Sequence, residues 1–212
     1  MNKVKLYKFR SLKDFYKIAD IFVNTRFYAA RYTELNDPME EIYDCFEDIH
    51  EKYVQQIAEG KRKLRICSFT SEYTNLLLWA HYADGFNGIC VEVEVDKDNY
   101  DFEYVEVNYS PFKVIVTNED STRLDEYPKI ILSGKNDVWE YENEVRLFSR
   151  SKFINKGIKI TKVLIGVRTT NEMKKVMRSI LPMNIPLHET FISPSTNEVE
   201  INTNSTTFEY KK

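Results

Sequence analysis

Hydrophobic and polar residues alternate over several short stretches of the chain, and this two-residue period predicts β-strands. The predicted strands are Val4–Phe9, Arg65–Thr70, Ile89–Val95, Tyr104–Tyr109, Val114–Val116, Glu144–Phe148 and Lys159–Ile165. Arg26–Leu35 is expected to hold one more short strand, and weaker strands follow Pro186. Within Ile89–Val95 the alternation predicts that Glu92 and Glu94 point outward.

Other stretches repeat their apolar residues at intervals of three and four, which predicts amphipathic helices. These helices are expected at Leu12–Phe22, Met39–Glu59, Thr74–Asp84, Asp120–Leu132 and Asn171–Leu181, with an interruption of the fourth near Pro128. Gly60 and Gly85 are predicted to end the second and third helices, and Pro182 to stop the last. Strands of mixed spacing with helices clustered early favour an α+β fold. Because the chain shows no internal repeat or linker, we predict a single domain over residues 1–212.

The composition excludes several classes of protein. Lys and Arg total 30 against 33 Asp and Glu, for a formal charge of −3, so no strong global field attracts nucleic acid or an anionic membrane, although a local basic patch fits this balance. No apolar run approaches the roughly 18 residues that a membrane helix needs, and Met1–Arg10 lacks a signal-peptide core. The three cysteines, Cys45, Cys67 and Cys90, have no zinc-finger or CxxC spacing. We therefore expect a soluble cytoplasmic protein.

Aromatic residues are the unusual part of the composition, with 14 Tyr and 13 Phe beside 6 Gly and 6 Pro. A tyrosine joins a large apolar ring to a hydroxyl that needs a partner. These residues fit two interpretations, namely core edges and strand faces, or a cleft that stacks a planar ligand such as a nicotinamide or a nucleobase.

Three separated polar segments are candidates for chemistry, and the first is the end of the opening strand. Arg10 is the last residue of Leu6-Tyr7-Lys8-Phe9-Arg10. At a sheet margin its guanidinium can pair in a bidentate manner with a phosphate or a carboxylate. A surface salt bridge is the simpler alternative.

The second segment is a strand with hydroxyl side chains, followed by a helix that contains a histidine. Alternation places Ser68 and Thr70 on one face of the strand, where their hydroxyls can orient a neighbouring acid or hold a ribose. Ser71 can instead serve as the cap of the next helix. In that helix His81, one of 3 histidines, precedes Tyr82 and is either a core residue or a catalyst.

The third segment contains Glu140, Glu142 and Glu144 at a spacing of two, so a strand would place all three carboxylates on one side. Crowded carboxylates repel one another unless a cation such as Arg146 or Arg10 is near. A solvated strand face is the usual explanation of this alternation. Glu144, however, leads directly into an apolar strand, where a carboxylate is costlier to place and therefore more suggestive.

Several functional motifs are absent. The chain has no GxxxxGK(S/T) or GxGxxG loop and no HExxH, so neither a phosphate loop nor a metal site is predicted. Asp84 with Glu92 and Glu94 suggests a metal nuclease, but the lysine that such enzymes place two residues after the glutamate is missing. The basic run Lys61–Arg65 either contacts phosphates or forms a solvated loop.

At these segments the chain resembles an uncharacterised bacterial family, catalogued as domain of unknown function 2971. The shared hallmarks are Tyr7-Lys8-Phe9-Arg10, Asn36-Asp37-Pro38-Met39-Glu40, Cys67-Ser68-Phe69-Thr70, Leu78-Trp79-Ala80-His81-Tyr82-Ala83-Asp84 and Trp139-x-Tyr141-Glu142-x-Glu144-Val145-Arg146-Leu147. They span most of the chain in the expected order. This resemblance supplies a family without an activity.

A looser resemblance, to ADP-ribosyltransferases of the arginine–serine–glutamate class, supplies an activity. That class has an Arg at the end of its first strand, a Ser-x-Ser/Thr strand in the middle and a late Glu-x-Glu before an apolar strand. Arg10, then Ser68 and Thr70, then Glu142 and Glu144 fall in this order. The resemblance implies a mixed, split β-sheet with flanking helices, an ADP-ribosyltransferase-like α+β fold.

The same resemblance implies a role for each residue. Arg10 would hold the diphosphate of NAD, and the strand of Ser68 and Thr70 would support the site. Glu144 would hydrogen-bond the nicotinamide ribose and stabilise the oxocarbenium-like cation as nicotinamide leaves, while Glu142 would engage the acceptor. The hypothesis assigns Glu144, Glu142 and His81 to catalysis, assigns Arg10, Ser68, Thr70 and Tyr82 to NAD binding, and includes no metal.

The resulting hypothesis is an enzyme that cleaves NAD and transfers ADP-ribose to a macromolecular acceptor, either protein or nucleic acid. Its bacterial relatives in activity include toxins and phage-defence effectors, so an antitoxin is a candidate partner and a membrane is not. It predicts that Arg10, Ser68, Thr70 and Glu144 line one pocket with at least two aromatic side chains. A non-catalytic nucleotide- or RNA-binding module is the alternative, with aromatics that stack a base and Lys61–Arg65 on phosphate. A nuclease is the third possibility.

Overall fold

The structure is a computed structural model that describes residues 2–37, 42–45, 49–117 and 123–203. Contacts within the chain define two compact units. Unit 1 consists of residues 1–27, 69–98 and 155–212, and unit 2 consists of residues 28–68 and 99–154. Both units mix helices with strands, which confirms the predicted α+β class. Among the described residues, no helix has the length and apolar character needed to cross a membrane.

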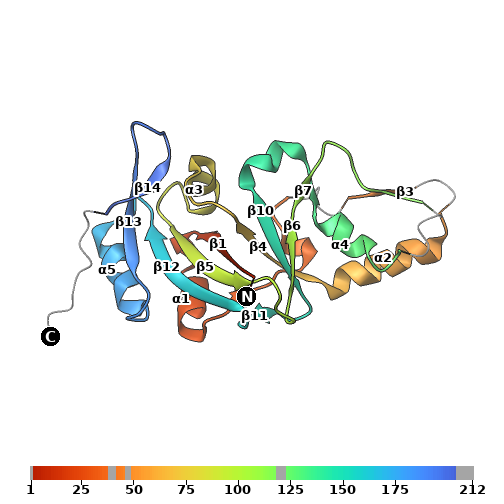
Figure 1. Ribbon diagram of the computed structural model, residues 1–212, viewed down its shortest axis with the longest axis horizontal. Coiled ribbons are helices and arrows are strands. Elements are labelled where there is room, and N and C mark those ends of the chain that lie inside the picture. The colour runs from red at the N-terminus through yellow and green to blue at the C-terminus, as the bar shows by residue number, and fades with distance from the viewer. Residues whose placement is uncertain (1, 38–41, 46–48, 118–122, 204–212) are drawn as a thin grey trace. The chain divides into compact units, whose positions relative to one another are not determined.

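Unit 1 is built on a mixed sheet (Figure 1). Its strands are β1 (Lys3–Arg10), β5 (Ile89–Asp96), β12 (Ile158–Ile165), β13 (Leu187–Ile192) and β14 (Val199–Ile201), in the order β14-β13-β12-β5-β1. Phe69 and Thr70, the last residues of β4 (Arg65–Thr70), follow β1 in this order through the pair Tyr7↔Thr70. Within the described part of unit 1, β12 and β13 pair in parallel and the other neighbouring strands pair antiparallel.

Strand β5 corrects one prediction from the sequence. Glu94 is half-buried and pairs with Lys3 at 2.7 Å, but the side chain of Glu92 is only 2% exposed. The prediction that Glu92 points outward to solvent is wrong. Side chains from the strands on both sides, Tyr7 of β1 and Thr161 of β12, contact the Glu92 carboxylate and keep water from it.

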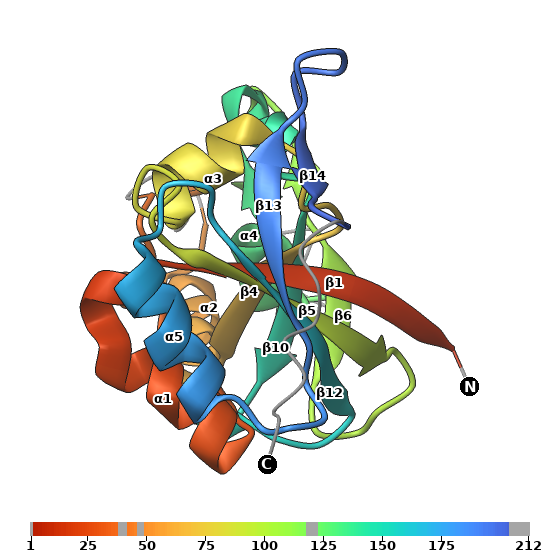
Figure 2. The ribbon, with the colours of Figure 1, turned by 90° about the vertical axis from the view of Figure 1, so that its left-hand side faces the viewer.

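Two helices of unit 1, α1 (Phe15–Asn24) and α5 (Asn171–Ile180), lie side by side (Figure 2). The predicted period places the apolar residues Ile18, Phe22 and Met177 in the core. A short turn η1 (Leu12–Asp14) precedes α1 and is capped by Ser11, whose hydroxyl accepts a hydrogen bond from the amide of Lys13 at 3.1 Å.

Helix α3 (Leu76–Tyr82) of unit 1 is shorter than predicted. Its cap is Asn75, whose side chain accepts from the amide of Leu77 at 2.9 Å, so the alternative cap Ser71 is wrong. The turn after the helix places Gly85 at φ +60°, in the left-handed region that favours glycine. At Gly88 a Cβ atom would collide with the carbonyl oxygen of Arg10, so this turn needs glycine for close approach.

The strands of unit 2 are short. Arg65–Ser68 of β4 is followed by β10 (Glu144–Ser149) and then by β6 (Glu103–Glu106), with β6 and β10 antiparallel. Two-residue strands form the additional pairs β2 with β11, β3 with β8 and β7 with β9. Their bounds are β2 (Phe27–Tyr28), β3 (Asp44–Cys45), β7 (Asn108–Tyr109), β8 (Ile115–Val116), β9 (Gly134–Lys135) and β11 (Phe153–Ile154).

Two helices of unit 2, α2 (Glu51–Lys63) and α4 (Tyr127–Leu132), enclose an apolar cluster. The buried members of this cluster are Ile57, Val116, Leu124, Tyr127 and Ile131. Gly60 lies inside α2, where a Cβ atom would collide with the ring of Pro128. The prediction that Gly60 ends a helix is therefore wrong, because its missing side chain permits close packing instead.

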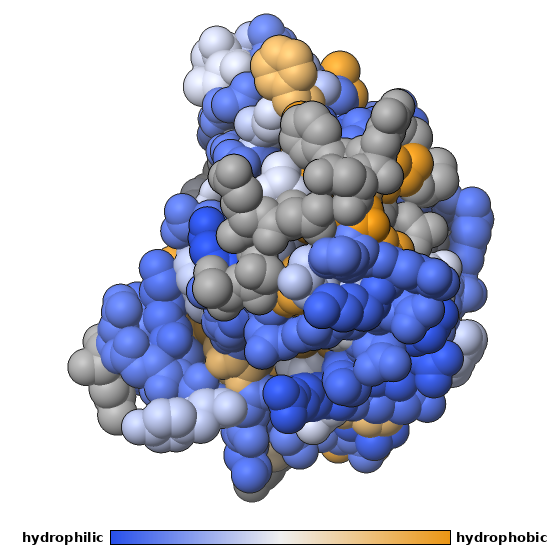
Figure 3. Space-filling view, turned by 90° about the vertical axis from the view of Figure 1, so that its right-hand side faces the viewer, coloured by the Kyte–Doolittle hydropathy of each residue, from blue (hydrophilic) through white to orange (hydrophobic). Residues whose placement is uncertain are grey.

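The helix predicted at Met39–Glu59 begins only at Glu51, and the chain before it forms β3. Residues 39–41 and 46–48 of this predicted helix, and residues 120–122 of the helix predicted at Asp120–Leu132, lie outside the described part of the chain. The outward residues of α2 are mostly charged or amide side chains. The surface on this side of unit 2 is accordingly mainly hydrophilic (Figure 3).

Candidate active site

The glutamate-rich segment of unit 2 is a helical turn rather than a strand. Residues Asp137–Glu142 form the 3-10 helix η4, which is capped by the side chain of Asn136 and ended by Asn143 at φ +42°. The prediction that three alternating glutamates share one strand face is therefore wrong. Glu140 is exposed, whereas Glu142 and Glu144 are 5% and 6% exposed.

Glu144 is the first residue of the fully buried strand β10 and is held by several donors at once. Arg146 donates to both of its oxygens, from Nε to Oε1 at 2.9 Å and from Nη2 to Oε2 at 2.9 Å. The Lys135 ammonium donates to Oε2 at 3.2 Å, and the side chain of Ser68 adds a further hydrogen bond. The carboxylate thus has a fixed orientation, because its donors come from different strands.

Lys135 joins the two buried glutamates. Its Nζ donates to Glu142 at 2.6 Å as well as to Glu144 at 3.2 Å, and the Lys135 side chain is 5% exposed. Its ammonium also lies 5.2 Å from the centre of the Trp139 ring, a cation–π distance. One ammonium therefore bridges two carboxylates that lie close together both in sequence and in space.

Strands β7 and β9 position this cluster. Tyr109 of β7 is opposite Lys135 of β9, and the amide of Ser110 donates to the carbonyl of Lys135 at 2.9 Å. The Tyr109 hydroxyl oxygen accepts the amide hydrogen of Glu144 at 2.7 Å. The backbone around Glu144 is thereby tied to the same short strand pair that carries Lys135.

The charges of the cluster balance, with Arg146 and Lys135 against Glu142 and Glu144. Burial by itself raises the pKa of Glu144, but Arg146 and then Lys135 outweigh it and bring the pKa to about 2. Burial likewise raises the pKa of Tyr109 to about 12. At neutral pH the Glu144 side chain is therefore an ionised carboxylate and Tyr109 is a neutral phenol.

The two hydroxyl residues predicted on one strand, Ser68 and Thr70, belong to different units. Ser68 belongs to unit 2, where it orients the acid Glu144, one of the two roles expected for it. Thr70 belongs to unit 1, is buried, and accepts a hydrogen bond from the amide of Glu72 at 3.3 Å. The Thr70 hydroxyl therefore stabilises the backbone directly after its own strand.

Arg10 is the half-buried last residue of β1 in unit 1, as predicted. Along β1 the register with β5 is unbroken from Lys3 to Arg10. Since successive residues project to opposite sides of a sheet, Arg10 projects to the side opposite Tyr7, whose partner across the sheet is Thr70. Because paired residues project to the same face, Arg10 and Thr70 lie on opposite faces of the sheet in unit 1, and the prediction that both line one pocket is wrong. That Arg10 meets Ser68 and Glu144 of unit 2 stays a prediction.

His81 and Tyr82 lie in α3 of unit 1. His81 is exposed and Tyr82 is half-buried, with their rings in an edge contact at 6.3 Å. The interpretation of His81 as a core residue is therefore wrong. Its apolar helix turns Leu78 and Trp79 inward and leaves His81 on the outer side.

Sequence reasoning missed a second buried carboxylate cluster, around Glu92 in unit 1. Thr161 donates to Glu92 at 2.7 Å and Tyr7 at 3.2 Å, while the ammonium groups of Lys162 and Lys5 lie at 3.0 and 3.6 Å. Burial alone would raise the pKa of Glu92, but bonds from Thr161 and Lys162 lower it below its ordinary value. The only local signal was a glutamate inside a Val-rich strand.

The basic run Lys61–Arg65 is not a loop, which corrects the prediction. Lys61 lies in the last turn of α2 and is 6% exposed, with its ammonium 4.8 Å from the Tyr32 ring centre and 5.3 Å from that of Tyr43. Arg65 opens β4 and donates to the carbonyl of Ala29. Arg62 and Lys63 of the same run are exposed, so the alternative in which this run contacts nucleic-acid phosphates stays a prediction that would not include Lys61.

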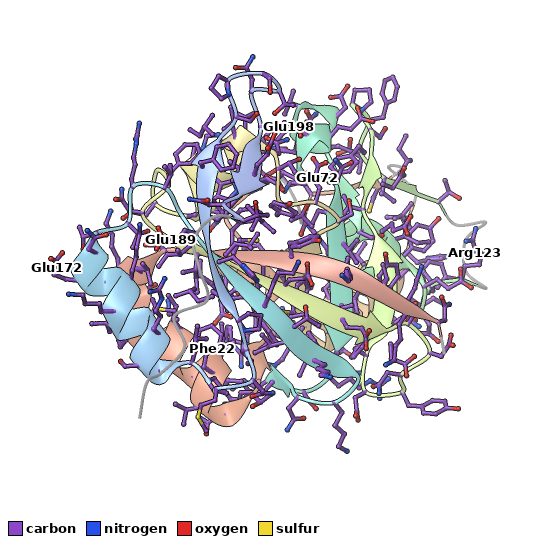
Figure 4. All side chains as sticks on the ribbon, turned by 60° about the vertical axis from the view of Figure 1, so that its left-hand side comes forward. Phe22, Glu72, Arg123, Glu172, Glu189 and Glu198 are labelled. Carbon is purple, nitrogen blue, oxygen red and sulfur yellow. The ribbon has the colours of Figure 1, made fainter. Side chains whose placement is uncertain are left out.

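A polar pocket of about 330 Å³ lies in unit 1. It is lined by Glu72, Thr74, Asn75, Leu76, Thr196, Asn197 and Glu198. Figure 4 labels Glu72 and Glu198, whose carboxylates make this pocket unfavourable for a diphosphate. The residues predicted to bind NAD are not among its lining.

Within the described ranges no group of three or more His, Cys, Asp and Glu side chains could hold a metal ion.

Residues 78–147 match the family model described as protein of unknown function DUF2971. The resemblance to that family is confirmed. The match includes Leu78–Asp84 and the whole glutamate segment up to Leu147, so the α3 hallmark and the cluster residues Lys135, Glu142, Glu144 and Arg146 fall within it, whereas Ser68 lies outside. No curated protein and no solved structure matches the chain.

Proposed function

We propose that this chain is an ADP-ribosyltransferase-like enzyme that cleaves NAD and transfers ADP-ribose to a macromolecular acceptor. The supporting observation is the hydrogen bond from Ser68 to Glu144. The resemblance pairs a hydroxyl strand with a late glutamate, and these side chains, far apart in sequence, make contact in unit 2.

The chemical task of Glu144 is to oppose the positive charge that develops on the ribose as nicotinamide leaves. Such preorganised charge is effective because it needs no reorientation during the reaction. Glu144 is suited to this role, since its pKa of about 2 keeps it ionised and its donors keep it oriented.

Glu144 also has to reach the substrate although its oxygens already accept several hydrogen bonds. A carboxylate offers about four acceptor positions. The hydrogen bond from Lys135, at 3.2 Å, is longer than the two from Arg146, at 2.9 Å. We assign the Lys135 position to the ribose hydroxyl of the bound substrate.

The remaining roles follow the resemblance. The resemblance would have Glu142 engage the acceptor, Arg10 hold the diphosphate, Tyr82 contribute to NAD binding and His81 act in catalysis. Thr70 lies on the sheet face opposite Arg10 and is not assigned to the diphosphate site. A toxin or phage-defence role, with an antitoxin as partner, accompanies this activity. Each of these roles is separable from that of Glu144 by substitution.

The decisive experiment measures nicotinamide release from NAD in the presence of a cell lysate, together with labelling of an acceptor. Glu144→Gln keeps the shape of the side chain and removes its charge, so kcat should fall by roughly 10²–10³-fold while NAD affinity changes much less. Glu142→Gln should reduce acceptor labelling more than nicotinamide release.

The matched control is Glu140→Gln, since Glu140 is the exposed glutamate of the same segment. It should be nearly silent. Full turnover by a folded Glu144→Gln variant would refute the catalytic assignment. Salt-sensitive RNA binding by a wild-type protein that releases no nicotinamide would support the binding module instead.

A further inference from the structure

The polar pocket of unit 1 is bounded by two segments that are far apart in sequence. Residues 72–76, which lead from β4 into α3, form one wall, and residues 196–198, in the turn between β13 and β14, form the other. Figure 4 labels one glutamate on each wall, Glu72 and Glu198. The volume of about 330 Å³ lies at the small end of the range of ligand sites, so the pocket can enclose a single side chain of another molecule.

Backbone hydrogen bonds fix the two walls. The amide of Val199 donates to the carbonyl of Thr74 at 2.9 Å and joins the walls directly. The indole of the fully buried Trp79 donates to the carbonyl of Tyr73 at 2.6 Å and anchors the first wall to the core. The pocket is therefore preformed, and binding would not require either wall to be ordered first.

Oxygen acceptors and negative charge dominate the lining. Among the described residues that line the pocket are two carboxylates, four hydroxyl or amide side chains and one apolar side chain, with no Lys or Arg: Glu72, Glu198, Thr74, Asn75, Thr196, Asn197 and Leu76. Glu198 is exposed and forms no ion pair with any residue that the structure describes. The lining therefore suits a cation that carries hydrogen-bond donors.

The negative potential extends to the residues beside the lining. Thr196 donates to a third carboxylate, that of Glu200, at 3.0 Å. Burial is the main reason that the pKa of Tyr73 is raised, and the charges of Glu198 and Glu200 raise it further. Both carboxylates thus act on the region next to the pocket, where they attract a cation and repel an anion.

We propose that this pocket binds the guanidinium group of an arginine side chain that belongs to a partner protein. A guanidinium carries five N–H donors in one plane and stays charged, so it can bond to acceptors on both walls at once. The described residues include no group of three or more His, Cys, Asp and Glu side chains for a metal ion. The glutamates repel the carboxylate of free arginine, which favours an arginine within a peptide chain.

This binding site does not rest on the proposed function. Its lining contains none of the residues assigned to NAD cleavage. A basic segment of a protein is the kind of partner that the pocket fits.

The test is an NMR titration of the ¹⁵N-labelled full chain, without NAD, with a blocked pentapeptide that has a central arginine between glycines. Backbone amide signals of residues 72–76 and 196–198 should shift. The same peptide with citrulline keeps the shape and removes the charge, and it should bind at least about fivefold more weakly, because each exposed ion pair contributes up to about 1 kcal/mol. Free arginine should bind more weakly than the blocked peptide.

Two substitutions locate the binding site. Glu198→Gln should weaken binding of the arginine peptide by about two- to fivefold, the effect of one exposed charge, and added salt should weaken binding to wild type. The matched control is Glu172→Gln, which alters an exposed glutamate of α5 in the same unit and should leave the Kd unchanged. If Glu198→Gln does not fold, the comparison of arginine and citrulline on wild type decides.

Each contrary result has a definite meaning. Equal binding of the citrulline peptide, shifts that lie away from the two walls, or no shift at all would overturn the inference. Tighter binding of free arginine than of the peptide would assign the pocket to a small molecule and refute the partner protein. None of these results bears on nicotinamide release, so the proposed function stands or falls separately.

Discussion

Glu144 in unit 2 and Glu92 in unit 1 are comparably buried, at 6% and 2% exposure of their side chains, but different cations neutralise them. The partners of Glu144, Arg146 and Lys135, are 0% and 5% exposed. The partners of Glu92, Lys162 and Lys5, are 25% and 62% exposed. One cluster is closed to water and the other is open at its cationic end.

The difference in the exposure of their cations decides what each cluster can contribute. Where cations remain hydrated, water replaces a lost partner and screens the remaining charge, so such a pair contributes little beyond local structure. Where every partner is buried, the loss of one leaves an uncompensated charge, and the charges that remain act at full strength on whatever binds. The closed cluster around Glu144 is therefore the better candidate for electrostatic catalysis.

The largest expected effect is on stability when the closed cluster loses its guanidinium. Arg146→Met removes the bidentate partner of Glu144 and the bond to Leu132. Breaking a buried ion pair in this way costs about 3–5 kcal/mol. Urea unfolding of wild type and variant measures the loss. A change below about 1 kcal/mol, the range of exposed pairs, would show that water reaches the cluster.

Acid should affect the closed cluster next. The folded-state pKa of Glu144 is about 2, below its ordinary value of 4.5, so its contribution to stability is present above pH 4.5 and is lost as the pH falls toward about 2. At about 1.4 kcal/mol per pH unit this amounts to a few kcal/mol. Unfolding free energies over this range should vary less with pH in Glu144→Gln than in wild type. Glu92→Gln, the matched change in unit 1, should flatten the acid response less.

Two tyrosine hydroxyls give a smaller and more direct comparison. Tyr109→Phe removes the acceptor of the Glu144 amide and leaves that N–H unpaired near the buried cluster, at a cost of about 1–3 kcal/mol. Tyr7→Phe removes one donor of several to Glu92 and should cost about 1 kcal/mol. Thermal and urea unfolding of both variants test the order. The reverse order would contradict the distinction between closed and open clusters.

The smallest effect is expected at the open cluster. Lys162→Met removes a 25% exposed ammonium from Glu92, which retains Thr161, Tyr7 and the more distant Lys5. The free energy of unfolding should fall by no more than about 1 kcal/mol. Added salt should reduce the difference between variant and wild type, since exposed pairs are screened. A loss as large as that of Arg146→Met would place Glu92 in the same class as Glu144.

Sequence patterns determined the type of most regular elements, although not all of their ends. Arg10 ends β1, Ser68 lies on β4, and Glu144 opens β10, each as the local pattern predicted. These features depend on residues within a few positions of one another, because strand alternation and helical period are local properties. Local patterns failed at Gly60 and in the glutamate segment. Gly60 lies inside a helix because it packs against Pro128, and the left-handed Asn143 ends a 3-10 helix where a strand was predicted.

Charge pairing was decided by the tertiary structure. The composition of the chain showed that acids and bases nearly balance, but it did not show which of them meet. Tyr7 and Thr161, from two other strands, donate hydrogen bonds to the buried Glu92. Ser68 and Lys135, also from two other strands, donate to Glu144 and fix its carboxylate. A carboxylate keeps its charge away from water only where donors surround it, and donors from separate strands converge only once the sheet has formed.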